Sequence, residues 1–442
     1  MSALAQALVA AGYDVSGSDR YLDRGIELEV LAKLARCGVR LVPQDGSGVV
    51  PGCEAVVVST AIESNNPDIE TARRQGIPIV HRATMLNRLI GGHYSIAVTG
   101  TSGKSTVTGM LGWTLAQTGK DPTVVLGATV MEWEDEQHLG NMRPGRRDFW
   151  VFEADESDRS LMQFEPDWAV ITNVSRDHFS AEEAYQLFSA FRQRVRKGSV
   201  GVLDDQSLLA RLSPVVHEEG SRFSYGGVEF RVKLPGRHNA ENALWVVRMC
   251  EKLGIDLTVV SRALAQFRGI RRRLERIGVA RGVLVVDDFA HNPSKIRATW
   301  ESLAPYHPRI FAIWRPHGYG PLAGMLEELA RTFSTIIRPA DRLYLLPVYD
   351  AGGTANRTVS HHLLAEHPLL KGLLVRAVEA PDTAAAEVVA AARAGDAIIT
   401  MGARDPFLPT LARTILRDLC GGSPTLQESS KAKEEIRPVS QE

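Results

Sequence analysis

The sequence has few cysteines and no long apolar run. Its 442 residues include only four cysteines (Cys37, Cys53, Cys250 and Cys420), and none of them form a CxxC pair. This argues against a disulfide framework or a zinc site and fits a reducing cytoplasm. No apolar run approaches the roughly 18 residues that a membrane span needs. The N-terminus also lacks the charged and apolar segments of a secretion signal, so we expect a cytoplasmic protein.

Neither positive nor negative charge is in excess. The formal net charge is -1, so nothing points to nucleic acid or to a membrane surface as a partner. Hydrophobic residues make up 44% of the chain, which is enough for several cores. At about 100–200 residues per domain, the length suggests two to four domains.

Short apolar runs alternate with helical patterns along the chain. Residues 55–59 are mostly β-branched, which is typical of a buried parallel strand, and Asn66-Pro67 then starts a helix. The alternation restarts near Tyr94 and again at Val283, and the run at Arg271, Arg272 and Arg273 marks an exit from the second unit. We predict an α/β fold of three domains at residues 1–92, 93–275 and 276–420, followed by a disordered polar tail at 421–442.

A glycine-rich turn joins an apolar strand to a helix at residues 96–106. Backbone N–H groups in such a turn converge on phosphate oxygens, and the helix dipole adds positive potential. Lys104 would reach the terminal phosphates of a nucleotide, and the Ser105 hydroxyl would coordinate Mg²⁺. The alternative is a turn that only makes a tight connection. The predicted nucleotide-binding residues here are Gly100, Thr101, Ser102, Gly103, Lys104, Ser105 and Thr106.

Acidic and histidine residues follow two further predicted strands. Carboxylates at the C-terminal end of a strand face the crevice where ligands bind in open α/β sheets. Glu153 is therefore the predicted Mg²⁺ ligand. Asp155, Glu156 and Asp158 either support that site or are solvated loop charges. His178 follows the strand at 168–172, beside Asp177. It is a candidate metal or phosphate ligand, although a lone histidine is usually a packed or surface residue.

These motifs, in this order, resemble those of the Mur ligase family. The resemblance covers nearly the whole chain. It includes Gly17-Ser18-Asp19, Asn66-Pro67, residues 236–239 with Asn242, Arg272-Arg273 and residues 287–293. It implies a Rossmann-like first domain that binds a UDP-sugar and a central P-loop ATPase-like domain that binds ATP and Mg²⁺. A Rossmann-like last domain would bring the amino acid.

The resemblance also implies a reaction. In this family a substrate carboxylate attacks the γ-phosphate of ATP, and an amine then attacks the resulting acyl phosphate. We expect the carboxylate of UDP-N-acetylmuramate and the amine of L-alanine to be joined, as in peptidoglycan synthesis.

Roles for individual residues follow from the resemblance. It implies that Lys104, Glu153, His178 and His291 are catalytic. It puts His238, Asn239 and Asn242 near the adenine, Arg273 near the nucleotide and the hinge, and Asp288 with His291 near the nucleotide and the amine. Asn239 and Asn242 could instead cap a helix, and the arginine run could be a solvated hinge face.

Departures from the family pattern leave other functions open. The family has a strand and a Gly-rich turn ahead of the helix that starts here at Met1, so we expect a first domain without its first strand. Gly318 and Pro321 stand where the alanine-adding branch has arginines, which keeps open another amine or acceptor, such as murein tripeptide. A third alternative is an inactive nucleotide-binding paralogue. We expect a monomer or a weak homodimer.

Overall fold

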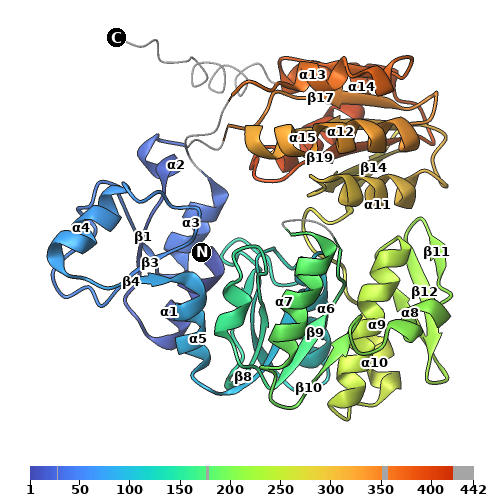
Figure 1. The fold of residues 1–442 in the computed structure, drawn as a ribbon. Helices are drawn as coiled ribbons and strands as arrows, with labels where there is room; N and C mark the ends of the chain where they lie inside the picture. The colour runs from blue at the N-terminus through green and yellow to red at the C-terminus, as the bar shows by residue number, and fades with distance from the viewer. Residues whose placement is uncertain (27, 176–178, 351–356, 422–442) are drawn as a thin grey trace, which may run out of the picture. The chain divides into compact units, whose positions relative to one another are not determined.

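The computed structural model describes residues 1–442 except 27, 176–178, 351–356 and 422–442. The chain forms two compact units, Met1–Arg273 and Leu274–Glu442, and both are mixtures of helices and strands (Figure 1). The boundary between the two units comes directly after Arg273, the last residue of the arginine run that was predicted to mark the exit from the second domain. The α/β fold class is thus confirmed, whereas nearly all of the predicted tail lies outside the described residues. Within the described ranges, none of the helices combines the length and apolar character needed to cross a membrane.

The N-terminal part of the first unit holds two parallel strand pairs. Among the described residues no pairing joins β1 and β2 to β3 and β4, so this part of the chain holds two small sheets. Alternation along the sequence does not determine which strands pair. The start of α4 follows the prediction, because the Asn66 side chain accepts a hydrogen bond from the Asp68 N–H and Pro67 takes the first helical position. The elements are α1 (Ser2–Ala11), β1 (Ser16–Ser18), α2 (Arg20–Asp23), α3 (Glu29–Arg36), β2 (Arg40–Val42), β3 (Val56–Val58), α4 (Pro67–Gln75), β4 (Ile79–His81) and α5 (Arg82–Ile90).

A six-stranded sheet dominates the rest of the first unit. Its strand order is β10-β9-β5-β8-β6-β7, and every neighbouring pair except β6–β7 is parallel. The central strand β5 is buried along nearly its whole length, as its apolar sequence predicts. The strands are β5 (Tyr94–Thr99), β6 (Pro122–Val125), β7 (Met142–Arg143), β8 (Arg146–Glu153), β9 (Trp168–Ile171) and β10 (Gly198–Gly201), with a separate sheet of β11 (Val215–His217), β12 (Gly220–Tyr225) and β13 (Val228–Val232). The helices are α6 (Lys104–Gln117), η1 (Ser160–Gln163), α7 (Ala181–Arg192), α8 (Gln206–Arg211), α9 (Arg237–Lys252) and α10 (Leu257–Leu264).

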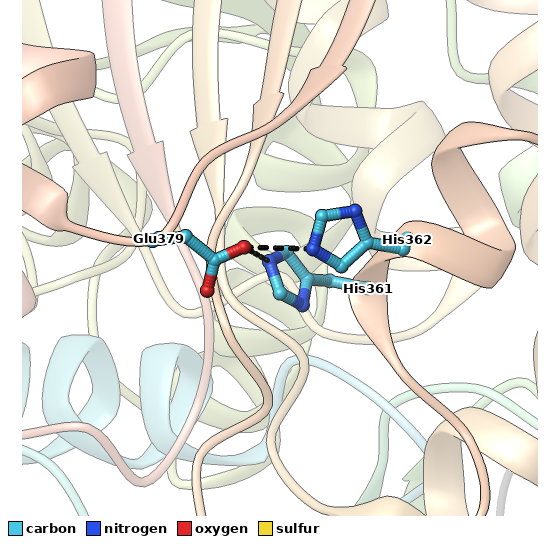
Figure 2. Close-up of side chains that lie close together, drawn as sticks. All are labelled: His361, His362 and Glu379. Atoms are coloured by element: carbon cyan, nitrogen blue, oxygen red, sulfur yellow. Dashed lines mark hydrogen bonds and ion pairs between the residues drawn. The ribbon is translucent and has the colours of Figure 1, made fainter.

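The second unit is built on another six-stranded sheet. Its order is β14-β15-β19-β16-β17-β18, and only β14 is antiparallel to its neighbour. Helix α13 begins with His361 and His362, whose rings both face Glu379 after β18 (Figure 2). The strands are β14 (Glu275–Ala280), β15 (Val283–Asp288), β16 (Ile310–Trp314), β17 (Arg342–Leu345), β18 (Val375–Ala377) and β19 (Ala397–Met401). The helices are α11 (Pro293–Leu303), α12 (Tyr319–Ile336), α13 (His361–Ala365), η2 (Pro368–Leu370), α14 (Pro381–Ala391) and α15 (Leu408–Leu419).

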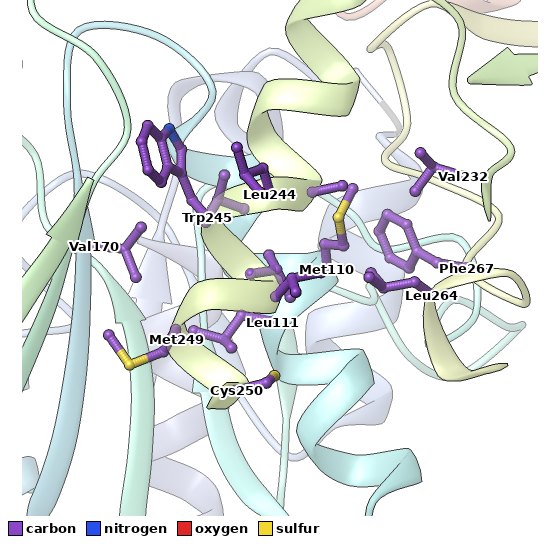
Figure 3. Close-up of a cluster of buried hydrophobic side chains, with 14 of the residues drawn as sticks. Met110, Leu111, Val170, Val232, Leu244, Trp245, Met249, Cys250, Leu264 and Phe267 are labelled. Carbon is purple, nitrogen blue, oxygen red and sulfur yellow. The ribbon is translucent and has the colours of Figure 1, made fainter. Parts of the chain in front are cut away.

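Helix α6 is packed on several sides, which fixes the glycine-rich turn that precedes it. Met110 and Leu111 lie among buried residues of α9, including Trp245 (Figure 3). On other faces of α6, a Cβ added at Gly109 would lie 2.6 Å from Ile270 Cδ1, and one at Gly112 would lie 2.8 Å from Val124 Cγ2. Glycine costs up to about 1 kcal/mol relative to alanine in a helix, but here it allows this close packing.

Candidate active site

Two glycines give the turn before α6 its shape. Gly100 has φ 131° and Gly103 has φ 81°, both in the region that side chains rarely adopt. A Cβ at Gly100 would lie 2.1 Å from Thr172 Oγ1, and one at Gly103 would lie 2.6 Å from Asn242 Oδ1. Gly103 is the N-cap residue of α6 and has no side chain, so it offers no side-chain oxygen to the first N–H groups of the helix. This leaves them suited to bind an anion.

The end of β9 holds the turn in place. The Ser102 N–H donates to Asn173 Oδ1 at 3.0 Å, and Asn173 Nδ2 donates to the Ser102 carbonyl at 3.0 Å. The Thr172 hydroxyl donates to the same carbonyl at 2.6 Å. The Thr101 hydroxyl donates to the Ser175 carbonyl at 3.1 Å. The turn is therefore fixed before any ligand binds. Sequence reasoning missed Thr172 and Asn173 as supports, although their place at a strand end was a usable signal.

Lys104 is held by a buried ion pair. Its Nζ lies 2.6 Å from Glu156 Oε2 and donates to the Gly100 carbonyl at 3.1 Å. Burial opposes the charge on Lys104, but Glu156, Glu153 and Asp155 outweigh it and raise the pKa of the ammonium group. Burial raises the pKa of Glu156 despite the nearby ammonium. Glu156 is only 3% exposed, so it is not the solvated loop charge that the sequence left open.

Ser105 and Glu153 form a compact group of oxygen atoms. The Ser105 hydroxyl lies 2.9 and 3.1 Å from the two carboxylate oxygens of Glu153. The Gly127 N–H donates to Glu153 Oε2 at 2.8 Å, which orients the carboxylate. A hydroxyl and a carboxylate are the hard oxygen ligands that Mg²⁺ prefers. The residues present therefore fit a magnesium site.

The other two acidic residues of the same loop contact the start of α5. Asp155 Oδ2 lies 2.7 Å from Arg82 Nη2, and Asp158 Oδ2 lies 3.4 Å from both Arg82 Nη2 and His81 Nε2. The Asp158 side chain is only 10% exposed. These two carboxylates are thus paired with α5 and its preceding strand. The alternative of a solvated charge is wrong for Asp158, whereas the Asp155 side chain is still 30% exposed.

The three residues predicted near the adenine lie in the first two turns of α9. Asn242 contacts the glycine-rich turn before α6 at Gly103, so it does more than cap a helix. Asn239 Nδ2 donates to the Pro235 carbonyl at 2.7 Å, which is a local structural role. His238 is half-buried, and the protein packed around its ring lowers its pKa to about 4. It is therefore neutral at pH 7.

The remaining predicted residues divide among three places. Thr106 is buried in the first turn of α6, whereas His178 lies outside the described residues. Arg273 is the last residue of the first unit, and Asp288 and His291 belong to the second. The Asp288 carboxylate accepts from the Leu274 and Ala290 N–H groups at 2.6 and 2.7 Å. Much of its hydrogen-bonding capacity is thus used locally.

His291 has a defined orientation within the second unit. Its Nδ1 lies 2.8 Å from the Phe289 carbonyl oxygen, which can only accept, so Nδ1 carries a proton. Its Nε2 lies 3.5 Å from Lys295 Nζ. The His317 ring packs edge-on against it, with centroids 4.7 Å apart. In its neutral form His291 therefore keeps the Nε2 lone pair as an acceptor.

Comparison with known proteins places these sites in a family. Three family models match the chain: the catalytic domain of the Mur ligase family at residues 1–94, the Mur ligase middle domain at 98–213, and the Mur ligase glutamate ligase domain at 272–404. The chain belongs to the Mur ligase family. The three-domain α/β organisation is thereby confirmed, while the domain boundaries given above stay predictions.

Individual members of the family are similar over most of their length. A UDP-N-acetylmuramate–L-alanine ligase from Cyanothece is 35% identical over 411 residues, which covers 82% of each chain. The crystal structure of a UDP-N-acetylmuramate-alanine ligase from Thermotoga maritima has a TM-score of 0.77 at 25% identity and covers 97% of each chain. A murein peptide ligase from Psychrobacter arcticus has a TM-score of 0.66 at 20% identity, covering 96% of this chain and 97% of its own, and shows the shared fold.

The glycine at position 100 allows a test of whether the glycine-rich turn before α6 binds phosphate in this Mur ligase. We expect Gly100→Ala to weaken ADP binding at least about tenfold, because its Cβ would displace either Thr172 or the turn and add strain of about 1–3 kcal/mol. Isothermal titration with ADP measures this. Gly119→Ala is the matched control, since Gly119 also has positive φ but an added Cβ would meet no atom within 4 Å. Equal ADP affinity in both variants would show that the turn does not cradle phosphate.

Proposed function

We propose that this chain is an ATP-dependent ligase that joins the carboxylate of UDP-N-acetylmuramate to the amino group of L-alanine. The reaction would take place in the cytoplasm, during peptidoglycan synthesis, with the enzyme as a monomer or weak homodimer. The observation that carries the proposal is the convergence of Lys104, Ser105 and Glu153 on one glycine-rich turn. The substrates are supported by the relatives from Cyanothece and Thermotoga maritima, which are named for them.

The first step needs neutralisation of charge rather than a protein nucleophile. A carboxylate oxygen of the sugar bonds to the γ-phosphorus of ATP while the bond from that phosphorus to the bridging oxygen breaks. The products are ADP and an acyl phosphate. Both reactants are anionic, so a cation and backbone N–H groups must face the transferring phosphoryl group. Lys104 and the first N–H groups of α6 are the groups we assign to this task.

Lys104 has a partner that it can exchange for phosphate. Its ammonium group forms an ion pair with Glu156 and donates a hydrogen bond to the Gly100 carbonyl. The ammonium group is therefore already desolvated and directed along the turn. Binding of the nucleotide would replace some of these contacts with phosphate oxygens. Glu156 then serves to keep the ammonium group charged while it is buried.

Ser105 and Glu153 are the residues that would hold Mg²⁺. The ion, when bound, would offset negative charge on the nucleotide phosphates. The Gly127 N–H keeps the Glu153 carboxylate turned towards Ser105. His178 remains a predicted third ligand. Arg273 and the α9 residues His238, Asn239 and Asn242 remain proposed contacts of the nucleotide.

The second step needs an amine with a free lone pair. The nitrogen of L-alanine attacks the acyl carbon, the carbon–oxygen bond to phosphate breaks, and the nitrogen loses a proton. We assign the acceptor role to His291, because its Nδ1 donates to the Phe289 carbonyl and its Nε2 lone pair, which lies 3.5 Å from Lys295 Nζ, can then accept a proton. Asp288 is proposed to orient this segment through its bond to the Ala290 N–H.

An ADP-release assay with a panel of substrates tests the function. We expect ADP to appear only when ATP, UDP-N-acetylmuramate and L-alanine are all present. Replacing L-alanine by glycine, L-serine or D-alanine should lower the rate, and omitting the sugar should abolish it. Release with L-alanine no faster than with ATP alone would contradict the proposal.

A second candidate is a ligase that attaches a murein tripeptide to the same sugar. Gly318 and Pro321 favour it, because the alanine-adding branch has arginines at these positions and a larger amine substrate needs more room. The same assay separates the two, since faster turnover with the tripeptide than with L-alanine would select this candidate. ADP binding without turnover for any pair would select the inactive paralogue.

A further inference from the structure

Two histidines and a glutamate converge in the second unit, and none of them was assigned a role above. His361 and His362 are the first two residues of α13, and Glu379 lies between β18 and α14. One ligand atom from each lies within 4.8 Å of the other two. His362 Nε2 lies 2.7 Å from Glu379 Oε1, and His361 Nε2 lies 3.7 Å from the same oxygen (Figure 2).

His361 is the unusual member of this group. Its side chain is only 7% exposed, and its Nε2 has no hydrogen-bond partner among the described residues. A buried polar atom normally has a partner, because leaving it unsatisfied costs about 1–3 kcal/mol. Glu379 Oε1 is too distant to form a hydrogen bond with this nitrogen, but both atoms are close enough to bind one metal ion placed between them. The unpaired nitrogen points towards that carboxylate oxygen.

The neighbouring groups have the chemistry of transition-metal ligands. Imidazole nitrogen and carboxylate oxygen suit Zn²⁺, which is bound at about 2.0–2.2 Å in tetrahedral sites. Such bond lengths separate ligand atoms by about 3.3 Å. The observed separations of 2.7 and 3.7 Å lie on either side of that value. Small rotations of the exposed His362 and Glu379 side chains would equalise them.

We propose that His361, His362 and Glu379 form a binding site for Zn²⁺, with water as the fourth ligand. The ion would give the buried His361 nitrogen its missing partner and join the start of α13 to the segment after β18. The scarcity of cysteine argued against a zinc site, but that argument concerns thiolate ligands, and this set contains none. None of these three residues was assigned a role in either step of the ligation, so the proposal goes beyond the proposed function.

Zinc titration of the full-length, untagged protein tests the proposal. The protein is first treated with EDTA and dialysed into millimolar Mg²⁺, which occupies sites made of hard oxygen ligands. Zn²⁺ is then added in competition with a chromogenic chelator, and Co²⁺ absorption reports whether the ligands are tetrahedral. We expect one equivalent to bind with a Kd below about 10 μM, and tetrahedral Co²⁺ bands.

Variants of the two exposed ligands keep the test independent of folding. We expect His362→Ala and Glu379→Gln each to weaken zinc binding at least about tenfold. His367→Ala is the matched control, because His367 Nε2 lies 3.1 Å from Glu327 Oε2 in a histidine–glutamate pair that no second histidine joins among the described residues. It should bind zinc within about twofold of the unaltered protein. Absence of saturable binding in the unaltered protein, or equal affinity in all three variants, would overturn the proposal.

Discussion

Replacing Lys104 by alanine is expected to lower kcat/KM for ADP release by at least about 100-fold, because the γ-phosphoryl group loses its fixed cation. The ammonium group is buried and preorganised by Glu156 and the Gly100 carbonyl, so neither water nor a buffer cation can take its place. Steady-state assays with saturating Mg²⁺ measure the effect. The loss should appear mainly in kcat, since the charge on the transferring group grows towards the transition state.

The control for this prediction is Lys120→Ala. Lys120 is an exposed lysine just beyond the end of α6, so the variant removes the same charge from a position outside the site. We expect its kcat/KM to stay within about twofold of the original value. Thermal unfolding of both variants checks that the Lys104→Ala protein still folds, because this substitution removes the ion-pair partner of the buried Glu156. Turnover of a folded Lys104→Ala protein within a factor of about ten of the original would show that the phosphate-turn assignment is wrong.

Replacing Glu153 by glutamine is expected to lower kcat at least about 100-fold and to raise the Mg²⁺ concentration needed for half-maximal activity. The substitution keeps the size of the side chain but removes its charge and exchanges one oxygen for an amide nitrogen. That nitrogen can donate but cannot ligate a cation. Ser105 alone is a weak ligand, so the ion would be held poorly. Initial rates measured over a range of Mg²⁺ concentrations give both quantities.

Glu165→Gln provides the comparison for Glu153→Gln. Glu165 is 63% exposed and lies 2.7 Å from Arg194 in a surface ion pair, which is worth at most about 1 kcal/mol. Its variant should keep the original rate and the original Mg²⁺ requirement. If Glu153→Gln showed the same Mg²⁺ requirement as Glu165→Gln, Glu153 would not be the ligand. The hydrogen bonds between Ser105 and Glu153 would then have only a structural role.

Local features of the site could be predicted because they depend on residues close together in the sequence. The strand at Tyr94–Thr99, the turn and the start of α6 at Lys104 follow from one short segment of apolar residues, glycines and Lys104-Ser105. Asn66-Pro67 predicts a helix start in the same way, and Asn66 does accept from the Asp68 N–H. The order of such motifs along the chain was also enough to indicate the family.

Contacts between distant segments could not be predicted in this way. The acidic residues after β8 look alike in the sequence, yet Glu156 is buried against Lys104 while Asp155 and Asp158 face Arg82. Which carboxylate meets the lysine depends on how the loop leaves the sheet. The hydrogen bonds from Thr172 and Asn173 to Ser102 depend in turn on β9 lying beside β5.

The sequence by itself determined the fold class, the glycine-rich turn and the family, because periodicity, turn residues and side-chain type act over a few positions. Only the tertiary structure decided which partner each charged group has. The sheet order β9-β5-β8 does not follow the chain, and it alone brings three separate strand ends to one site. The same reason applies to His361, His362 and Glu379, which the fold of the second unit brings together from two separate segments.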